Sequence, residues 1–235
     1  MKIQATFIIL LWGFVSCQQH QTTESVVTPV KKSNSEKLEK YPKKLLKGTT
    51  AAIDTTQKWI ELKSIDSSFI YDIRYATKNN FVHKKMYPCP KCFVRVEVAK
   101  ALLKIQDELK SKGWKIKLFD CYRPGKVQQE LWDMMPNPSY VANPKTGSMH
   151  NRGVAVDLTL VDRQGKELNM GTPYDYFGKK AYHAYAKLPD TVLKNRRFLK
   201  NIMSKYGLEP IKSEWWHYSY RAKEYPVEQW VWSCP

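Results

Sequence analysis

The segment from Val154 to Leu160 constrains the fold most, because a carboxylate interrupts an otherwise apolar alternation. One face of the segment is wholly apolar and consists of Val154, Val156, Leu158 and Leu160. The other face consists of Ala155, Asp157 and Thr159. A period of two predicts a β-strand with one face in the core. Burying Asp157 on that strand is costly without a partner, and a metal ion is one such partner.

Two histidines accompany this strand and complete a metal-ligand pattern. His150 lies just before the strand, and His217 ends the run Glu214-Trp215-Trp216-His217. Two imidazoles and one carboxylate are a common catalytic zinc set that leaves a fourth position for water. Either histidine alone is more often merely hydrogen-bonded, so the joint pattern carries the prediction. We expect one Zn²⁺ per chain on His150, Asp157 and His217, with Glu214 as general base.

The spacing of Glu214 and His217 sets a geometric condition. Residues 214 to 220 have the pattern of a strand, in which positions three apart face opposite sides. Either Glu214 precedes the strand or a bulge redirects its side chain.

The remaining periodicity predicts a mixture of helices and strands. Helices are expected over residues 94–112, 125–135 and 190–206. The alternation over 114–118 predicts a further, half-exposed strand that continues to Asp120. The elements do not alternate as regular βαβ units, which favours an α+β domain.

The N-terminus has the pattern of an export signal. Lys2 precedes an apolar run over residues 7–15, which is too short to span a bilayer. Residues 14–17, F-V-S-C, resemble the lipobox of bacterial lipoproteins, although an ordinary secretory signal is the alternative. We expect a signal peptide over 1–16, a lipidated Cys17 that starts a flexible basic tether over 17–54, and a folded domain over 55–235. Gln18 follows Cys17, which favours the periplasmic side of the outer membrane.

The formal charge of +17 is partly concentrated in the tether, where residues 31–47 carry +5. A polybasic segment beside a membrane or a polyanionic wall gains electrostatic attraction. Nucleic acid is not expected as a partner, because an exported chain rarely meets it and no recognition motif is present.

Several segments together resemble one enzyme family. The motifs S-M-H-N-R-G-V-A-V-D-L-T-L and E-W-W-H-Y are similar to those of VanX-type zinc D-alanyl-D-alanine dipeptidases. Further matching segments are Y-D-I-R-Y-A-T-K-N-N-F, F-D-C-Y-R-P and N-M-G-T-P-Y-D-Y-F. The resemblance covers residues 60–225 and implies a single hedgehog-like domain with a central antiparallel sheet flanked by helices.

The resemblance also implies roles for individual residues. Arg123 would stabilise the oxyanion, and Asp175 would receive the free ammonium of the substrate with help from Tyr75. Ser148 would contact the substrate carboxylate. For these last three residues a structural role is the alternative: a helix cap for Asp175, core packing for Tyr75 and a turn for Ser148.

Four cysteines remain beyond Cys17, namely Cys89, Cys92, Cys121 and Cys234. An even count in an oxidising compartment suggests two disulfides, with three possible pairings. The C-x-x-C spacing of Cys89 and Cys92 is also found in redox and zinc sites, but no second such pair or βαβ context accompanies it. A bridge at Cys121 would brace Arg123.

Together with the N-terminal pattern, the resemblance implies hydrolysis of D-alanyl-D-alanine, or a close D,D-dipeptide, by an enzyme anchored to the membrane by lipid in the cell envelope. One alternative is a D,D- or L,D-carboxypeptidase or endopeptidase that trims peptidoglycan stem peptides on the same zinc site. A second is a wall-binding lipoprotein without catalytic activity, which would not need Glu214 or Arg123.

Overall fold

The computed structural model describes residues 53–54 and 56–234, all of which belong to one compact unit, Lys47–Pro235. The predicted signal peptide, Cys17 and nearly all of the tether lie outside the described residues, so their predictions stay as stated. Among the residues that the structure describes, no helix is both long and apolar enough to cross a bilayer.

A five-stranded sheet forms the centre of the domain, in the order β2-β4-β5-β7-β6. Its strands are β2 (Ile70–Tyr71), β4 (Lys115–Asp120), β5 (Ala155–Val161), β6 (Leu208–Pro210) and β7 (His217–Tyr220). The pairs β4-β5, β5-β7 and β6-β7 are antiparallel. The α+β prediction is confirmed, with one refinement: the edge strand β2 pairs parallel to β4.

The middle strand, β5, is the one predicted from alternating residues. It is buried along its whole length, including the face that carries Asp157 and Thr159. The polar face therefore does not meet solvent but lies against the loops that build the site. In the strand pairing Asp157 stands opposite both Asp120 of β4 and His217 of β7.

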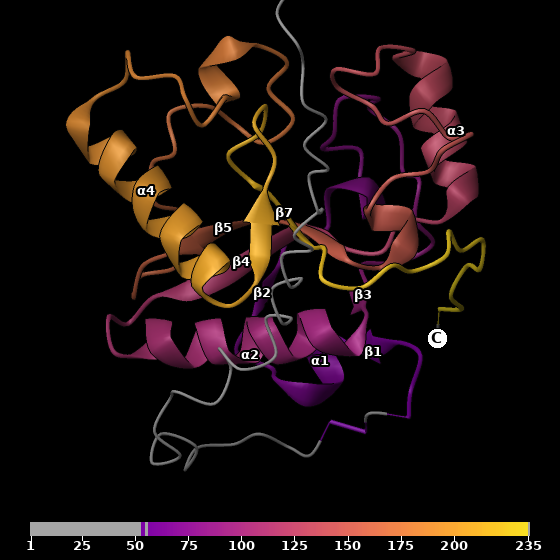
Figure 1. Cartoon of the computed structure of the whole chain (residues 1–235), viewed down its shortest axis with the longest axis horizontal. Coiled ribbons are helices and arrows are strands. Elements are labelled where there is room, and N and C mark those ends of the chain that lie inside the picture. Colours follow the sequence, from indigo (N-terminus) through magenta and orange to yellow (C-terminus); the bar gives the residue numbers. More distant parts are fainter. Residues whose placement is uncertain (1–52, 55, 235) are drawn as a thin grey trace, which may run out of the picture. The chain divides into compact units, whose positions relative to one another are not determined.

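Three longer helices complete the domain, and they agree with the predicted ranges to within two residues at each end. They are α2 (Val96–Lys110), α3 (Gly125–Met134) and α4 (Asp190–Lys205). In Figure 1, α2 runs beneath the sheet. It buries Leu102, Ile105 and Leu109 completely, as its apolar spacing requires. Its C-terminal part is joined to that of α4 by the ion pair of Glu108 with Lys205.

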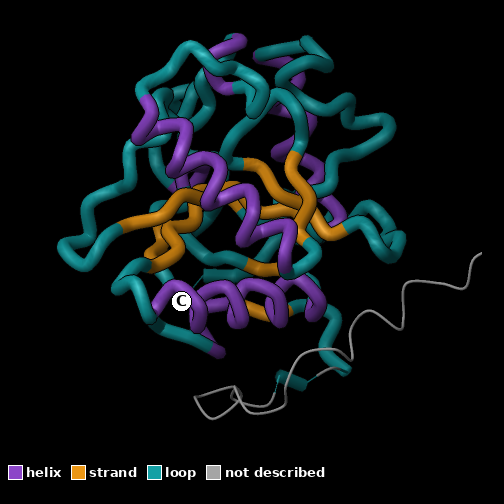
Figure 2. Tube along the Cα trace, turned by 60° about the vertical axis from the view of Figure 1, so that its left-hand side comes forward, coloured by secondary structure: helices purple, strands orange, loops and turns teal. Residues whose placement is uncertain are grey.

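Short elements and loops make up the rest of the described chain. They include α1 (Leu62–Ile65), η3 (Arg74–Ala76), η4 (His150–Arg152) and η5 (Lys179–Ala181), and a separate antiparallel pair of β1 (Ile60–Glu61) with β3 (Phe93–Val94). Long loops, teal in Figure 2, occupy the region above the strands. Two disulfides, Cys89–Cys234 and Cys92–Cys121, cross-link these loops and select one of the three pairings that the sequence left open.

Candidate metal centre

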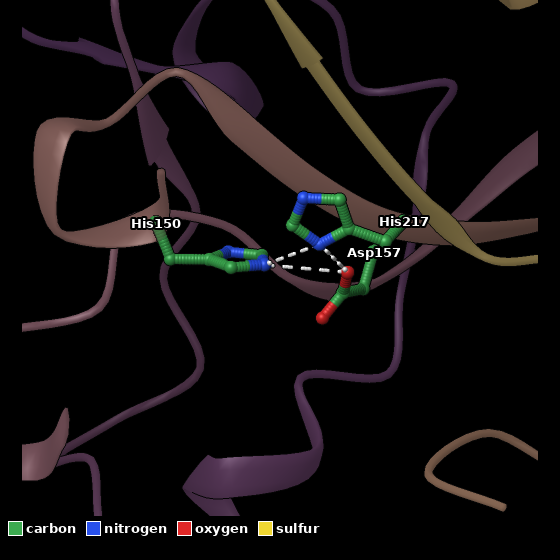
Figure 3. A group of neighbouring side chains, drawn as sticks. All are labelled: His150, Asp157 and His217. Carbon is green, nitrogen blue, oxygen red and sulfur yellow. Dashed lines mark hydrogen bonds and ion pairs between the residues drawn. The ribbon is translucent and has the colours of Figure 1, made fainter. Parts of the chain in front are cut away.

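Three buried side chains from different elements converge in the middle of the domain. His150 comes from η4, Asp157 from β5 and His217 from the first position of β7, and they point toward one another in Figure 3. His150 Nε2 lies 3.1 Å from His217 Nδ1 and 3.3 Å from Asp157 Oδ1, and the last two atoms are 3.0 Å apart. All three residues are buried. This group could hold a metal ion.

The size of this triangle fits zinc. Tetrahedral Zn²⁺ binds imidazole nitrogen and carboxylate oxygen at about 2.0–2.2 Å, which separates neighbouring ligand atoms by about 3.3–3.5 Å. The measured separations of 3.0–3.3 Å need only a slight expansion to reach that geometry. The donor set of two nitrogens and one carboxylate oxygen also matches zinc in chemistry.

A hydrogen bond to one ring nitrogen of His150 determines which of its two nitrogens is free to bind a metal. His150 Nδ1 lies 2.7 Å from the carbonyl oxygen of Cys121, and a carbonyl can only accept a hydrogen bond. Nδ1 therefore carries the proton, and Nε2 presents a lone pair to Asp157 and His217. Such a hydrogen bond to the second nitrogen is the usual support of a metal-bound histidine.

The charges of the group suit a cation. Burial acts against ionisation of Asp157, but His150 and His217 outweigh it and hold the pKa of Asp157 far below its usual value. Burial lowers the pKa of His217, which favours its neutral form. Burial also acts against a charged His150, but the charge of Asp157 prevails and raises the pKa of His150. A cation in the triangle would take the place of the proton that these groups otherwise share.

Glu214 lies beside the triangle and not within it. Its Oε2 atom is 3.9 Å from His217 Nδ1, and its side chain keeps 19% exposure. Strand β7 begins only at His217, so Glu214 precedes the strand, which is the first of the two arrangements expected from sequence. Burial, together with the carboxylates of Asp157 and Asp175, raises the pKa of Glu214 well above its usual value.

Arg123 approaches the triangle from the end of β4. Its Nη2 atom lies 4.0 Å from Asp157 Oδ2. Nε and Nη2 donate to Asp120 Oδ2 at 3.0 and 2.7 Å, and Nη1 donates to Gln128 Oε1 at 3.0 Å. These contacts engage three of the five N–H groups of a guanidinium and hold its plane rigidly. This buried ion pair with Asp120 orients Arg123 toward the metal group.

Asp175 and Tyr75 lie together, as the resemblance implied. The hydroxyl of Tyr75 donates to Asp175 Oδ2 at 3.1 Å, and the centroid of the Tyr75 ring lies 5.1 Å from the guanidinium carbon of Arg123. Asp175 has a positive φ of 56°, which is uncommon outside glycine and is typical of functional or turn positions. Burial and the charge of Asp157 raise the pKa of Asp175 to about 7. Tyr75 is also buried in the core, which was its alternative role, and its part in substrate binding stays a prediction.

Ser148 takes the turn-forming role that was its alternative. Its hydroxyl oxygen accepts a hydrogen bond from the backbone N–H of His150 at 3.0 Å, which shapes the turn that presents His150. A contact of Ser148 with substrate stays a prediction.

Two residues of the site, Asp120 and Tyr174, escaped the sequence analysis. Asp120 has no exposure and accepts from the Tyr87 hydroxyl at 2.7 Å besides holding Arg123. The Tyr174 hydroxyl donates to Asp157 Oδ2 at 3.0 Å, and so orients the carboxylate whose other oxygen faces the two histidines. A carboxylate at the buried end of a strand, three residues before an arginine, was the available signal for Asp120.

Comparison with known proteins places these residues in a family context. The family described as D-ala-D-ala dipeptidase matches residues 55–231. A D-alanyl-D-alanine dipeptidase of Escherichia coli (strain K12) is 33% identical over 182 residues, which is 77% of this chain and 94% of that protein. One of Enterococcus faecium is 31% identical over 177 residues, which is 66% of this chain and 88% of that protein.

The similarity to solved structures is weaker than the similarity in sequence to these dipeptidases. The zinc-bound vancomycin resistance D,D-pentapeptidase of a VanB-type cassette has a TM-score of 0.37 and 18% identity, over 55% of this chain and 73% of that chain. The relationship therefore rests on the family match and on the two curated dipeptidases.

Proposed function

We propose, because this chain belongs to the D-Ala-D-Ala dipeptidase family, that it hydrolyses D-alanyl-D-alanine to free D-alanine with one bound zinc ion. The observation that carries this proposal is the buried triangle of His150, Asp157 and His217, with Glu214 and Arg123 at its margin. The ligand residues are almost fully buried, whereas Glu214 keeps enough exposure to meet a substrate.

Each residue at the margin has a distinct task in peptide hydrolysis. A bound zinc ion supplies Lewis-acid polarisation and makes water acidic enough to lose a proton near neutral pH. The Glu214 carboxylate accepts that proton and passes it to the leaving amine nitrogen. Two N–H groups of Arg123 make no hydrogen bond among the described residues, and they donate to the carbonyl oxygen as negative charge develops on it.

Recognition of a dipeptide requires a partner for its free ammonium group. The Asp175 carboxylate, oriented by the Tyr75 hydroxyl, provides an anion for this group. A longer peptide has no ammonium at that position and would leave Asp175 buried and unpaired. The pair therefore favours dipeptides over stem peptides.

The cell envelope is the proposed location. Cys17 would be the lipidated N-terminus of the mature chain, on the periplasmic side of a bacterial membrane, with the outer membrane favoured. The two disulfides among the described residues support export, because disulfides persist in oxidising compartments.

The test compares substrates of different length. The purified zinc-loaded chain is incubated with D-Ala-D-Ala or with a stem pentapeptide that ends in D-Ala-D-Ala, and released D-alanine is measured. We expect turnover of the dipeptide alone, and we expect Asp175→Asn to raise the KM for the dipeptide at least about tenfold because an ion pair is lost.

Other outcomes would change the assignment. Preference for the pentapeptide would move the chain to carboxypeptidase activity on the same metal group. Release of D-alanine from neither substrate, by protein shown to contain zinc, would contradict the catalytic proposal.

A further inference from the structure

The end of β4 and the turn η4 are joined by a compact set of hydrogen bonds. The Cys121 carbonyl accepts from His150 Nδ1 at 2.7 Å, and the Arg123 backbone N–H donates to the His150 carbonyl at 3.2 Å. The side-chain amide of Asn151 donates to the Arg123 carbonyl at 2.8 Å. Residues 120–123 therefore position both a metal ligand and Arg123.

A third segment, residues 92–95, is bonded to both sides of this junction between residues 120–123 and η4. Cys92 forms a disulfide with Cys121, and the neighbouring Phe93 carbonyl accepts from the Tyr122 backbone N–H at 2.9 Å. Two residues further, the Arg95 backbone N–H donates to the Gly153 carbonyl at 2.9 Å, just beyond η4. Residues 92–95, which contain β3, thus contact both halves of the junction, and the disulfide is their covalent link to the half that carries the Cys121 carbonyl.

We propose that the Cys92–Cys121 disulfide is a positioning element of the metal site, which keeps the Cys121 carbonyl against His150 Nδ1. The inference rests on the proposed zinc function and extends it to residues that touch neither metal nor substrate. The carbonyl holds the proton on Nδ1 and aims the Nε2 lone pair at Asp157 and His217. Loss of such a contact typically weakens metal binding 10- to 100-fold.

The second disulfide provides a matched control within the same chain. Cys89–Cys234 ties the C-terminal segment to the loop before β3, and among the described residues neither cysteine is a hydrogen-bond partner of His150, Asp157 or His217. It spans a sequence separation of 145, against 29 for Cys92–Cys121. Chain-entropy arguments therefore predict that its removal costs more stability than removal of Cys92–Cys121. If both bridges were purely structural, removal of Cys89–Cys234 would reduce both stability and zinc affinity more than removal of Cys92–Cys121.

The experiment compares two double variants with the parent chain, each purified with its remaining disulfide formed. One carries Cys92→Ser with Cys121→Ser, and the other carries Cys89→Ser with Cys234→Ser. Zinc affinity is measured by competition with a chromogenic chelator, and thermal unfolding is followed without zinc. We expect the first variant to bind zinc about 10- to 100-fold more weakly. The second variant should keep zinc affinity within about threefold of the parent while unfolding at the lower temperature.

Two results would overturn the inference. One is unchanged zinc affinity in the Cys92/Cys121 variant, and the other is an equal loss of affinity in both variants. Because zinc affinity is read without turnover, failure of the parent to cleave D-Ala-D-Ala would reject the proposed function and leave this inference standing.

A variant with all cysteines intact covers the case in which the first variant does not fold. Asn151→Ala removes the amide that joins η4 to the Arg123 carbonyl. Zinc binding weaker than that of the parent is expected, again measured by chelator competition. Parent-like zinc affinity in Asn151→Ala would contradict the positioning role of this junction.

Discussion

At the scale of single residues, the site is a set of buried charges that satisfy one another. Asp120 accepts four hydrogen bonds, from the Tyr87 hydroxyl, the Cys121 backbone and two nitrogens of Arg123. A buried ion pair is stable only when further hydrogen bonds offset its desolvation, and Asp120 meets this condition. Arg123 therefore stays charged, and its orientation is set before any substrate arrives.

Substitution of Glu214 distinguishes proton transfer from metal binding. Glu214→Gln keeps the size of the side chain but cannot accept a proton, so turnover of D-Ala-D-Ala should fall about 10²- to 10⁴-fold. Zinc content should be unchanged, because Glu214 is not one of the three converging ligands. Steady-state kinetics and metal analysis check both parts, with Asp157→Asn as the control variant that should lose zinc.

The pH dependence of the activity of the parent chain should report the ionisation of Glu214. Burial and neighbouring carboxylates raise the pKa of Glu214, and a protonated carboxyl cannot act as a base. Activity should therefore rise as pH increases through that pKa, and this acidic limb should be absent in Glu214→Gln. Retention of parental turnover by Glu214→Gln would contradict the assignment of the base.

At the scale of elements, a short turn determines how two ligands on neighbouring elements meet. Gly153 ends η4 with a φ of 71°, a left-handed conformation that glycine adopts at little cost. A Cβ atom there would lie 2.1 Å from Cζ3 of Trp59, so the turn also packs against a ring. The turn brings the chain from His150 directly into β5, where Asp157 faces back toward it.

Substitution of this glycine should be costly for both reasons. Gly153→Ala is expected to destabilise the domain by about 2–4 kcal/mol, of which about 1 kcal/mol comes from the left-handed backbone and the rest from displacing Trp59. Thermal unfolding of the zinc-free protein measures the change.

Gly165→Ala is a matched control, because Gly165 has a φ of 79° and no atom within 4 Å of an added Cβ. It should cost only the backbone part of that free energy. Equal losses in the two variants would show that Trp59 yields freely.

At the scale of the whole molecule, the metal group connects parts of the chain that are far apart in sequence. His150, Asp157 and His217 belong to η4, β5 and β7, and the two disulfides cross-link the loops around them. A ligand that binds only the folded state stabilises it by mass action. Zinc should therefore act as a further cross-link of the domain.

Metal removal should lower the melting temperature markedly. With zinc at about 1,000 times its dissociation constant, the stabilisation is about 4 kcal/mol, which corresponds to roughly 8–16 °C for a domain of this size. Calorimetry before and after dialysis against a chelator measures the shift. The Asp157→Asn variant should show little shift, and an unshifted parent would contradict the metal site.

The sequence by itself determined the elements whose pattern is local. The alternation of β5 and the apolar spacing of α2 and α4 are visible within the segments themselves, so their bounds agree closely with the structure. The motifs around His150, Asp157 and His217 were equally visible, because metal ligands must be particular residue types at particular spacings.

Only the tertiary structure decided what depends on contacts between distant segments. The strands β1, β2 and β3 have two residues each, which is too short for any period to appear in the sequence. The disulfide pairing, the start of β7 after Glu214 and the hydrogen bond of the Tyr87 hydroxyl to Asp120 were likewise outside local patterns. The physical reason is that a pairing or a buried charge is stabilised by its partner, and the partner is chosen by the packing of the whole chain.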